Sequence, residues 1–240
     1  SVSLNGGALA GGTNITVTGT GFVTGATVTV GGVTCTSPNV TNSTTLTCTT
    51  GAHAAGVTSI VVTNTDTQFG TGTNLYTFQA APTVTSVNLN AGALAGGTSI
   101  TITGTGFLSG ATATVGGVTC TTPNVSNATT MTCTTGAHAA GVTSIIVTNS
   151  DTQTGTGTNL YTYQAAPTVT IASPSAGALA GGTSISITGT GFVTAATVTV
   201  GGVACTSPNV TNSTTMTCTT GAHAAGLTNI IVTNADTQSG

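Results

Sequence analysis

Apolar and polar residues alternate with a period of two along most of this 240-residue chain. Ile15 and Val17 are separated by a threonine, and so are Val28 and Val30. Residues two apart share one face of a β-strand, so such stretches predict half-buried strands with threonine on the outer face. Gly31-Gly32, between two of these strands, is typical of a two-residue hairpin turn with positive φ. No stretch has the period of an amphipathic helix, which indicates an all-β protein.

The pattern occurs three times, and corresponding residues are 85 positions apart, as in Cys35, Cys120 and Cys205. A fixed internal period indicates an array of one structural unit. Each unit is large enough for its own core, which would bury roughly 60–65% of the surface of the unfolded unit. About seven short strands in a unit of this size are typical of a β-sandwich. We therefore predict three domains, at residues 1–81, 82–166 and 167–240.

Two stretches resemble a known family. The run AGGTSITITGTGF at residues 95–107, followed by ATVGG at 113–117, is similar to an IPT/TIG domain. The run YTYQAAPTVT at residues 161–170, where the second unit ends and the third begins, is also similar to this family. The resemblance covers all three units and implies an immunoglobulin-like fold. The family includes DNA-contacting modules, receptor ectodomain spacers, accessory domains of secreted enzymes and tandem arrays on bacterial surfaces, so fold alone does not carry function over.

The joints between units are short. Tyr76-Thr77-Phe78 belongs to one predicted strand, and Gln79-Ala80-Ala81-Pro82 leads almost directly into the first strand of the next unit. Proline favours an extended conformation in the residue before it and limits bending there. We therefore expect three tandem immunoglobulin-like β-sandwich domains in a rod-like array.

Composition excludes several kinds of partner. The chain has no lysine or arginine, three acidic residues and a net charge of -3. Phosphate binding depends on lysine and arginine, so we expect neither a nucleic-acid partner nor an anionic membrane surface. Threonine, serine and glycine interrupt every apolar run before the ~18–20 residues that a spanning helix needs, so no membrane insertion is expected. So little charge leaves weak self-repulsion, which favours lateral association.

Each unit contains two cysteines 13 positions apart. One pair per unit, with none left over, predicts one disulfide within each domain, formed in an oxidising compartment outside the cell. Closing a loop of this length would contribute roughly 3 kcal/mol. The alternatives are free buried thiols or a metal pair, but two cysteines and one histidine do not complete a four-ligand zinc site. The predicted partners are Cys35 with Cys48, Cys120 with Cys133, and Cys205 with Cys218.

One histidine and one aspartate recur in each unit, His53 and Asp66 in the first. A catalytic histidine needs a nucleophile and an orienting carboxylate. We therefore interpret His53 as a loop residue with a structural hydrogen bond, with a contact between subunits as the alternative. Calcium sites usually gather several carboxylates, so Asp66 is interpreted as a turn residue bonded to its own backbone, with weak calcium binding as the alternative. We predict no enzyme activity, no cofactor and no metal.

Asn-x-Ser/Thr sequences mark candidate sites of covalent N-linked glycans. Two of them recur in every unit, close to a proline, in a segment that we expect to be an exposed loop. O-linked sugars on the threonine-rich faces are an alternative coat. Either would supply the solubility that the missing charges do not. The candidate asparagines are Asn14, Asn39, Asn42, Asn124, Asn127, Asn209 and Asn212.

The first and last units begin and end at informative points of the repeat. Ser1 corresponds to Ser86, inside the first predicted strand, and Gly240 corresponds to Gly155, just before the last one. We expect the third unit to lack its final strand and to leave an unpaired edge. One explanation is a window on a longer tandem chain. The other is strand complementation, in which a neighbouring subunit supplies the missing strand.

These observations favour a structural subunit of an extracellular filament, sheath or surface stalk that associates with copies of itself, head to tail or laterally. Residues 1–70 and 86–155 are roughly 80% identical, and adjacent near-identical domains raise the risk of domain swapping, so equivalent contacts along a regular assembly would explain the similarity. The alternative is the stalk of an adhesin or glycan-binding surface protein. A third reading, the accessory domain of a secreted enzyme, has no catalytic residues to support it.

Overall fold

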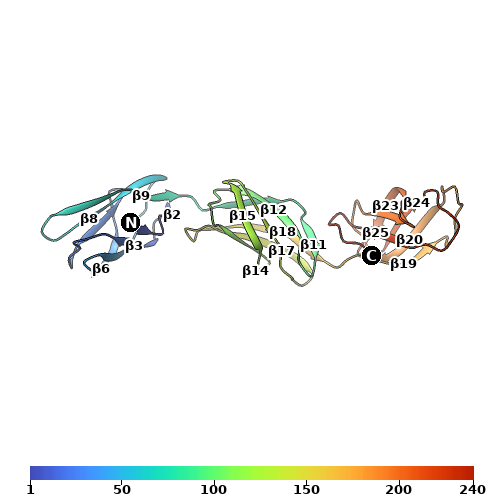
Figure 1. Ribbon diagram of the computed structural model, residues 1–240, viewed down its shortest axis with the longest axis horizontal. Coiled ribbons are helices and arrows are strands. Elements are labelled where there is room, and N and C mark those ends of the chain that lie inside the picture. The colour runs from blue at the N-terminus through green and yellow to red at the C-terminus, as the bar shows by residue number, and fades with distance from the viewer.

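The computed structural model describes all of residues 1–240, which form three β-sandwich domains arranged in one row (Figure 1). Every regular element is a strand, as the period-two pattern predicts, and no helix is present that could cross a membrane. Each domain packs two sheets face to face around its own apolar core, as in an immunoglobulin-like sandwich. The predicted fold class is therefore confirmed.

The first domain contains two sheets with the strand orders β1-β3-β7-β6 and β2-β9-β8-β4-β5. Neighbouring strands are antiparallel except for β2 and β9, which run parallel. Its strands are β1 (Val2–Ser3), β2 (Gly6–Ala8), β3 (Asn14–Thr18), β4 (Thr27–Val30), β5 (Val33–Thr34), β6 (Thr36–Asn42), β7 (Thr45–Thr49), β8 (Gly56–Thr63) and β9 (Phe69–Gln79).

The second domain repeats this topology, with the sheets β10-β12-β16-β15 and β11-β18-β17-β13-β14. Its strands are β10 (Thr83–Val87), β11 (Ala91–Ala93), β12 (Ser99–Thr105), β13 (Thr112–Val115), β14 (Val118–Thr119), β15 (Thr121–Asn127), β16 (Thr130–Thr134), β17 (Gly141–Thr148) and β18 (Thr154–Gln164).

The third domain has a complete sheet, β19-β20-β24-β23, and a smaller one, β22-β21-β25, without counterparts of β2 and β9. The expected unpaired edge is partly covered, because Val232 of β25 exchanges backbone hydrogen bonds with Gly240 at 2.9 Å and 3.1 Å and Thr233 forms a bridge with Ser239. Its strands are β19 (Thr168–Ser173), β20 (Ser184–Thr190), β21 (Thr197–Val200), β22 (Val203–Ala204), β23 (Thr206–Asn212), β24 (Thr215–Thr219) and β25 (Ile230–Thr233).

The alternation of apolar and polar side chains along each strand forms the cores of the domains. In β3, Ile15 and Val17 point inward and are 1% and 5% exposed, while the threonines between them face outward. Leu46, on β7 of the same sheet, and Ile60, on β8 of the opposite sheet, belong to the same core and are also buried. Burying such a side chain contributes about 1.5–3 kcal/mol, so each sandwich has its own source of stability. The Gly31-Gly32 hairpin turn is confirmed, with φ of 62° and 80° and Val30 paired with Val33.

The segment with the recurring Asn-x-Ser/Thr doublet is a strand, so the expected loop is wrong. Residues 36–42 form β6, an edge strand paired only with β7, and its asparagines are exposed as predicted. Pro38 is tolerated there because an edge strand leaves one side of the backbone unpaired. The register shifts between Thr36 and Asn39, and Ser37 has a φ of 50°, so a bulge accommodates the proline.

Candidate functional site

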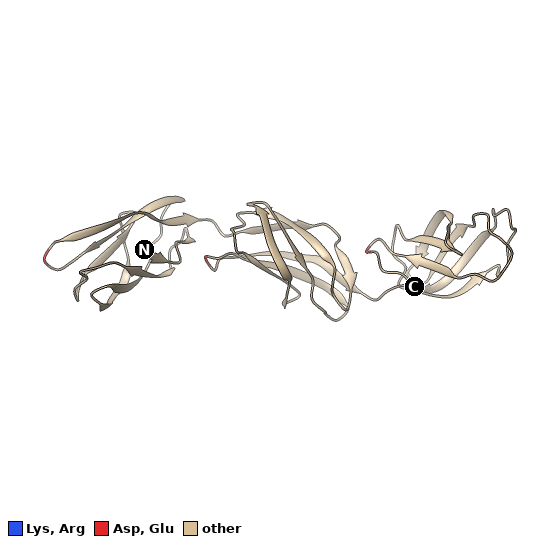
Figure 2. Ribbon diagram, viewed as in Figure 1, with Lys and Arg blue, Asp and Glu red and all other residues tan.

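The acidic residues lie at the same end of each domain (Figure 2). In the first domain, Asp66 lies in the turn between β8 and β9 and accepts a hydrogen bond from the backbone N–H of Gln68, at 3.0 Å. Asp151 and Asp236 make the same bond, each at 3.1 Å. The interpretation of these aspartates as turn residues bonded to their own backbone is confirmed.

At the first joint, Asp151 has a second role that the sequence analysis missed. The side-chain amide of Gln79, the last residue of β9, donates to Oδ2 of Asp151 at 2.6 Å. The amide of Gln153 donates to the same oxygen at 2.8 Å and to the backbone carbonyl of Gln79 at 3.2 Å. We call these three residues the first joint clasp. It connects the end of the first domain to a turn of the second.

The second joint repeats the clasp. Gln164 donates to Oδ2 of Asp236 at 2.7 Å, and Gln238 donates to that oxygen at 2.6 Å and to the carbonyl of Gln164 at 3.2 Å. The distances differ by no more than 0.2 Å from those of the first clasp. The two clasps therefore have the same hydrogen-bond arrangement.

Both clasp carboxylates are buried, although the chain contains no cationic side chain to pair with them. Asp151 is 4% exposed and Asp236 is 7% exposed. A buried charge is costly unless it is hydrogen-bonded, and amide donors to a carboxylate make bonds stronger than those between neutral groups. The cost of burying these carboxylates is therefore offset by hydrogen bonds, and part of that compensation comes from the glutamine of the preceding domain. The recurrence of a glutamine at the end of the first two units, Gln79 and Gln164, was the signal available for finding the clasps.

The joint segment continues directly into the next sandwich. Only residues 80–82 separate β9 from β10, and β10 pairs with β12 from Thr83 onward. The Thr83 and Thr105 hydroxyls are 2.7 Å apart, and Val84 packs into the core of the second domain with 9% exposure. Asn149 fastens the same end, because its amide donates to Gly106 O at 2.8 Å. These contacts confirm the short joints expected from the sequence.

The cysteines of each unit face one another in the core. Cys120 and Cys133 form a disulfide, which connects the segment between β14 and β15, where the chain crosses between sheets, to β16. In the other two domains the same pairs are present as buried thiols. The hydrogen bond from Cys48 lowers the pKa of Cys35, and this bond together with burial raises the pKa of Cys48. The disulfides of the first and third domains remain predictions.

The recurring histidine is a structural residue, as interpreted. His53 stacks on Phe78 with ring centroids 4.8 Å apart, and its Nδ1 lies 2.7 Å from the carbonyl oxygen of Ala54. His138 repeats both contacts, with Tyr163 as the stacking partner. No group of three or more histidine, cysteine, aspartate or glutamate side chains is arranged to hold a metal ion. In the first two domains the histidine therefore packs on the aromatic ring near the end of β9 or β18, whereas His223 keeps only the contact of its Nδ1 with the carbonyl oxygen of Ala224, at 2.8 Å.

All the candidate glycosylation asparagines are exposed. Asn42 adopts a compact turn in which its Oδ1 accepts hydrogen bonds from the backbone and hydroxyl of Thr44, at 2.9 Å and 2.8 Å. Asn127 and Asn212 repeat this turn with Thr129 and Thr214. The amide nitrogen, which would carry a glycan, makes no hydrogen bond in this turn, since only Oδ1 is bonded. Attachment of sugars there remains a prediction.

Comparison with known proteins agrees with this architecture. The family model described as "IPT/TIG domain" matches residues 1–80, 82–163 and 167–240. No curated protein sequence matches the chain. Among solved structures, the full extracellular region of plexin A4 is similar over 94% of this chain and 21% of its own length, with 23% identity and a TM-score of 0.52. A surface glycan-binding protein of Bacteroides ovatus, solved with a mixed-linkage heptasaccharide, covers 93% of this chain and 55% of its own, at 15% identity and a TM-score of 0.31.

The chain thus spans about a fifth of the plexin structure, and the likeness at this identity concerns the fold. The family model, in contrast, covers nearly the whole chain in three consecutive matches. The chain belongs to the IPT/TIG domain family, of which it contains three tandem copies.

Proposed function

We propose that this protein is a structural subunit of an extracellular filament, sheath or surface stalk, in which it serves as a stiff spacer. The observation that carries the proposal is the repeated clasp. Two joints use the same three residue types at nearly the same distances and bury a carboxylate each. A joint that needed to bend would have to expose this charge and break its hydrogen bonds. Repetition of one joint geometry is what an extended, regular assembly requires.

Surface chemistry supports association of such rods. Each domain presents a long face of threonines without basic residues, and an exposed edge strand (β6, β15 or β23) with unpaired backbone groups. Unpaired strand edges favour pairing with another chain, and a net charge of -3 gives little repulsion. The cysteine pairs suit an oxidising extracellular location. No arrangement of nucleophile, base and carboxylate accompanies these features, so we propose a role without catalysis.

One observation favours a second candidate, the stalk of an adhesin or glycan-binding surface protein. Phe69 is 72% exposed at the end of the first domain that lies opposite the joint, whereas Thr154 and Ser239 occupy the corresponding positions of the other two domains. An exposed aromatic ring can stack on a sugar. A single unrepeated ring makes a small site, and the filament remains the better-supported function.

Negative-stain electron microscopy of the native protein at neutral pH tests the proposal. Continuous fibres with an axial repeat of one or three domains are expected. Isolated short rods that bind immobilised glycans, and lose this binding on Phe69→Thr substitution, would replace the filament by the adhesin stalk.

A further inference from the structure

The doublet of Asn-x-Ser/Thr sequences in each repeat places its two asparagines in different local structures. In the first domain Asn39 lies within β6 and pairs with Thr47 of β7. Asn42 is the last residue of β6 and immediately precedes the turn of Ser43 and Thr44. Both asparagines are exposed, so exposure does not distinguish the two sites, whereas the conformation of the chain does.

At Asn42 the turn brings the hydroxyl of the same Asn-x-Thr sequence onto the side-chain amide. Thr44 donates to Oδ1 of Asn42 from its backbone N–H at 2.9 Å and from its hydroxyl at 2.8 Å. The same two bonds form at Asn127, at 2.9 Å and 2.7 Å, and at Asn212, at 2.9 Å for both. N-linked glycosylation requires a serine or threonine two residues after the asparagine. In all three repeats this hydroxyl already lies against the amide that would be modified.

This arrangement suits the transfer of a sugar to Nδ2 from a donor activated at its anomeric carbon as a pyrophosphate ester. The bond from the anomeric carbon to the phosphate oxygen breaks and the pyrophosphate leaves with the electron pair. A bond forms from Nδ2 to the anomeric carbon, and the proton that Nδ2 loses passes to a base of the transferring enzyme. An amide nitrogen is a weak nucleophile because Oδ1 shares its lone pair. The hydrogen bonds to Oδ1 stabilise the charge that this oxygen gains as Nδ2 loses its proton, since bonds to a charged acceptor are stronger than neutral ones.

Asn39 has no such arrangement. Residues two apart along a strand are separated by about 6–7 Å, and the hydroxyl of Thr41 makes no hydrogen bond with Asn39. The two groups could meet only if β6 left β7, with which Asn39 pairs. Asn124 and Asn209 occupy the same paired position in β15 and β23. The folded sheet therefore holds the first asparagine of each doublet in an extended conformation.

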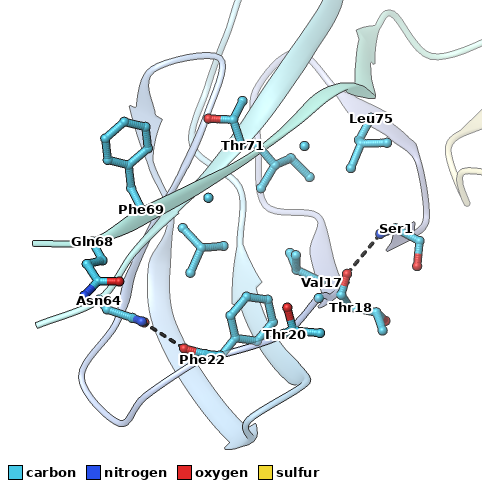
Figure 3. A pocket seen from close by; sticks show the side chains of 16 residues that line it. Ser1, Val17, Thr18, Thr20, Phe22, Asn64, Gln68, Phe69, Thr71 and Leu75 are labelled. Atoms are coloured by element: carbon cyan, nitrogen blue, oxygen red, sulfur yellow. Dashed lines mark hydrogen bonds between the residues drawn. The ribbon is translucent and has the colours of Figure 1, made fainter. Parts of the chain in front are cut away.

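The turn after Asn42 is fixed in place by the loop between β3 and β4. The backbone N–H of Phe22 in this loop donates to the carbonyl oxygen of Ser43 at 3.0 Å. From the other side, the side-chain amide of Asn64, just after β8, donates to the carbonyl oxygen of Gly21 at 2.8 Å (Figure 3). The second and third domains repeat the bond from Asn64 at the same distance. The turn is thus bonded into the sandwich and keeps its conformation when an enzyme approaches.

In the second domain this turn also lies beside the first joint. The end of β12 separates the two, because the backbone N–H of Gly104 donates to the carbonyl oxygen of Thr129 in the turn, at 3.0 Å. On its other side Gly104 lies against the joint segment, where an added Cβ atom would overlap the carbonyl oxygen of Thr83. A sugar on Asn127 would consequently extend from a point next to the joint.

The second joint has the same neighbours. Gly189 donates to the carbonyl oxygen of Thr214 at 2.9 Å, and an added Cβ atom on Gly189 would overlap the carbonyl oxygen of Thr168. Asn212 therefore lies beside the second joint as Asn127 lies beside the first.

We propose that the glycan of each repeat is attached to the folded chain at the second asparagine of the doublet, namely Asn42, Asn127 and Asn212. The first asparagine of each doublet stays unmodified, and so does Asn14 within β3. At Asn127 and Asn212 the glycan covers one side of the adjoining joint. This inference goes beyond the proposed filament and does not depend on it.

The first experiment treats the folded, sugar-free full chain with a soluble N-glycosyltransferase and UDP-glucose. Pepsin digestion and mass spectrometry then locate each glucose, since the chain has no lysine or arginine for trypsin. The first and third domains give the matched comparison, because both sequences of their doublets end in threonine. Glucose should occupy Asn42 and Asn212 at least tenfold more than Asn39 and Asn209. Equal or reversed occupancy, or no transfer at all, overturns the proposal.

A synthetic peptide of residues 36–47 is the control for sequence preference, because it contains both asparagines of the first doublet without the sheet. Both should be modified in the peptide. Modification of Asn42 alone would assign the selectivity to the sequence and contradict a role of the fold. In the full chain, Asn39→Gln should leave the glucose at Asn42 unchanged, and Asn42→Gln should remove it without creating one at Asn39.

The position beside the joints is tested by limited digestion of the glycosylated full chain with elastase, which cleaves after small residues. Ala80-Ala81 lies in the first joint and Ala165-Ala166 in the second. Asn127→Gln should speed cleavage at the first joint severalfold and leave the second unchanged. Asn212→Gln should have the opposite effect, so each variant is the control for the other. Cleavage rates at both joints that neither variant changes would show that the glycans do not cover them.

Discussion

Replacing Asp151 by alanine removes the carboxylate that holds the first joint. Of its three hydrogen bonds, the one from Gln79 Nε2 at 2.6 Å crosses between domains. A hydrogen bond to a charged group contributes about 1.5–3 kcal/mol, and the half-buried amide of Gln79 would also lose its partner. The bond from Gln153 to the Gln79 carbonyl remains. We therefore expect the straight joint to lose about 2–3 kcal/mol relative to bent ones, a roughly 30- to 150-fold change in their ratio.

Small-angle X-ray scattering measures this change, because bending one of two joints lowers the radius of gyration and the maximum dimension of the rod. Asp66→Ala is the matched control. Asp66 lies in the same turn and accepts the same backbone hydrogen bond at 3.0 Å, but it is exposed and touches no neighbouring domain. Asp66→Ala should leave the scattering curve unchanged, and Asp236→Ala should reproduce the bending at the second joint.

The reasoning would be refuted if Asp151→Ala and Asp66→Ala gave the same curve as the unmodified chain. The stiffness would then reside in the three-residue length of the joint and in the pairing of β10 with β12, not in the clasp.

Three further predictions concern the cysteines and the surface. Cys133→Ala should lower the free energy of unfolding of the oxidised second domain by roughly 3 kcal/mol in guanidinium titrations, and a reducing agent should abolish the difference. In the reduced chain, burial raises the pKa of Cys218 from 9.0 to about 12. The unfolded thiol ionises first, so stability should fall as pH rises from 9 towards 12, and Cys218→Ala should remove this slope. In a glycosylating host, Asn42→Gln should lower the mass by one glycan, whereas Asn74→Gln, outside any Asn-x-Ser/Thr sequence, should not; equal masses would exclude modification at Asn42.

Much of the fold could be predicted because its determinants are local. Alternation of Ile15 and Val17 with threonine assigns one face of a strand to the core whatever the strand pairs with. Gly31-Gly32 specifies a hairpin because few other residues adopt two consecutive positive φ angles. The 85-residue period identifies three copies of one domain without reference to contacts. The β6 segment was misjudged because a proline within an edge strand looks locally like a turn.

The clasp could not be predicted from the sequence, because it consists of contacts between residues that are far apart along the chain. Asp66, Asp151 and Asp236 occur in nearly identical surroundings along the chain, yet the first is exposed and the other two are buried. The difference arises because Gln79 and Gln164 approach from 72 residues away, across a joint between domains. The sequence by itself determined the strands, their inward faces and the number of domains, since side-chain alternation and turn geometry act over a few residues. Only the tertiary structure decided that Asp151 and Asp236 are buried, since their burial depends on a glutamine that reaches them from the preceding domain.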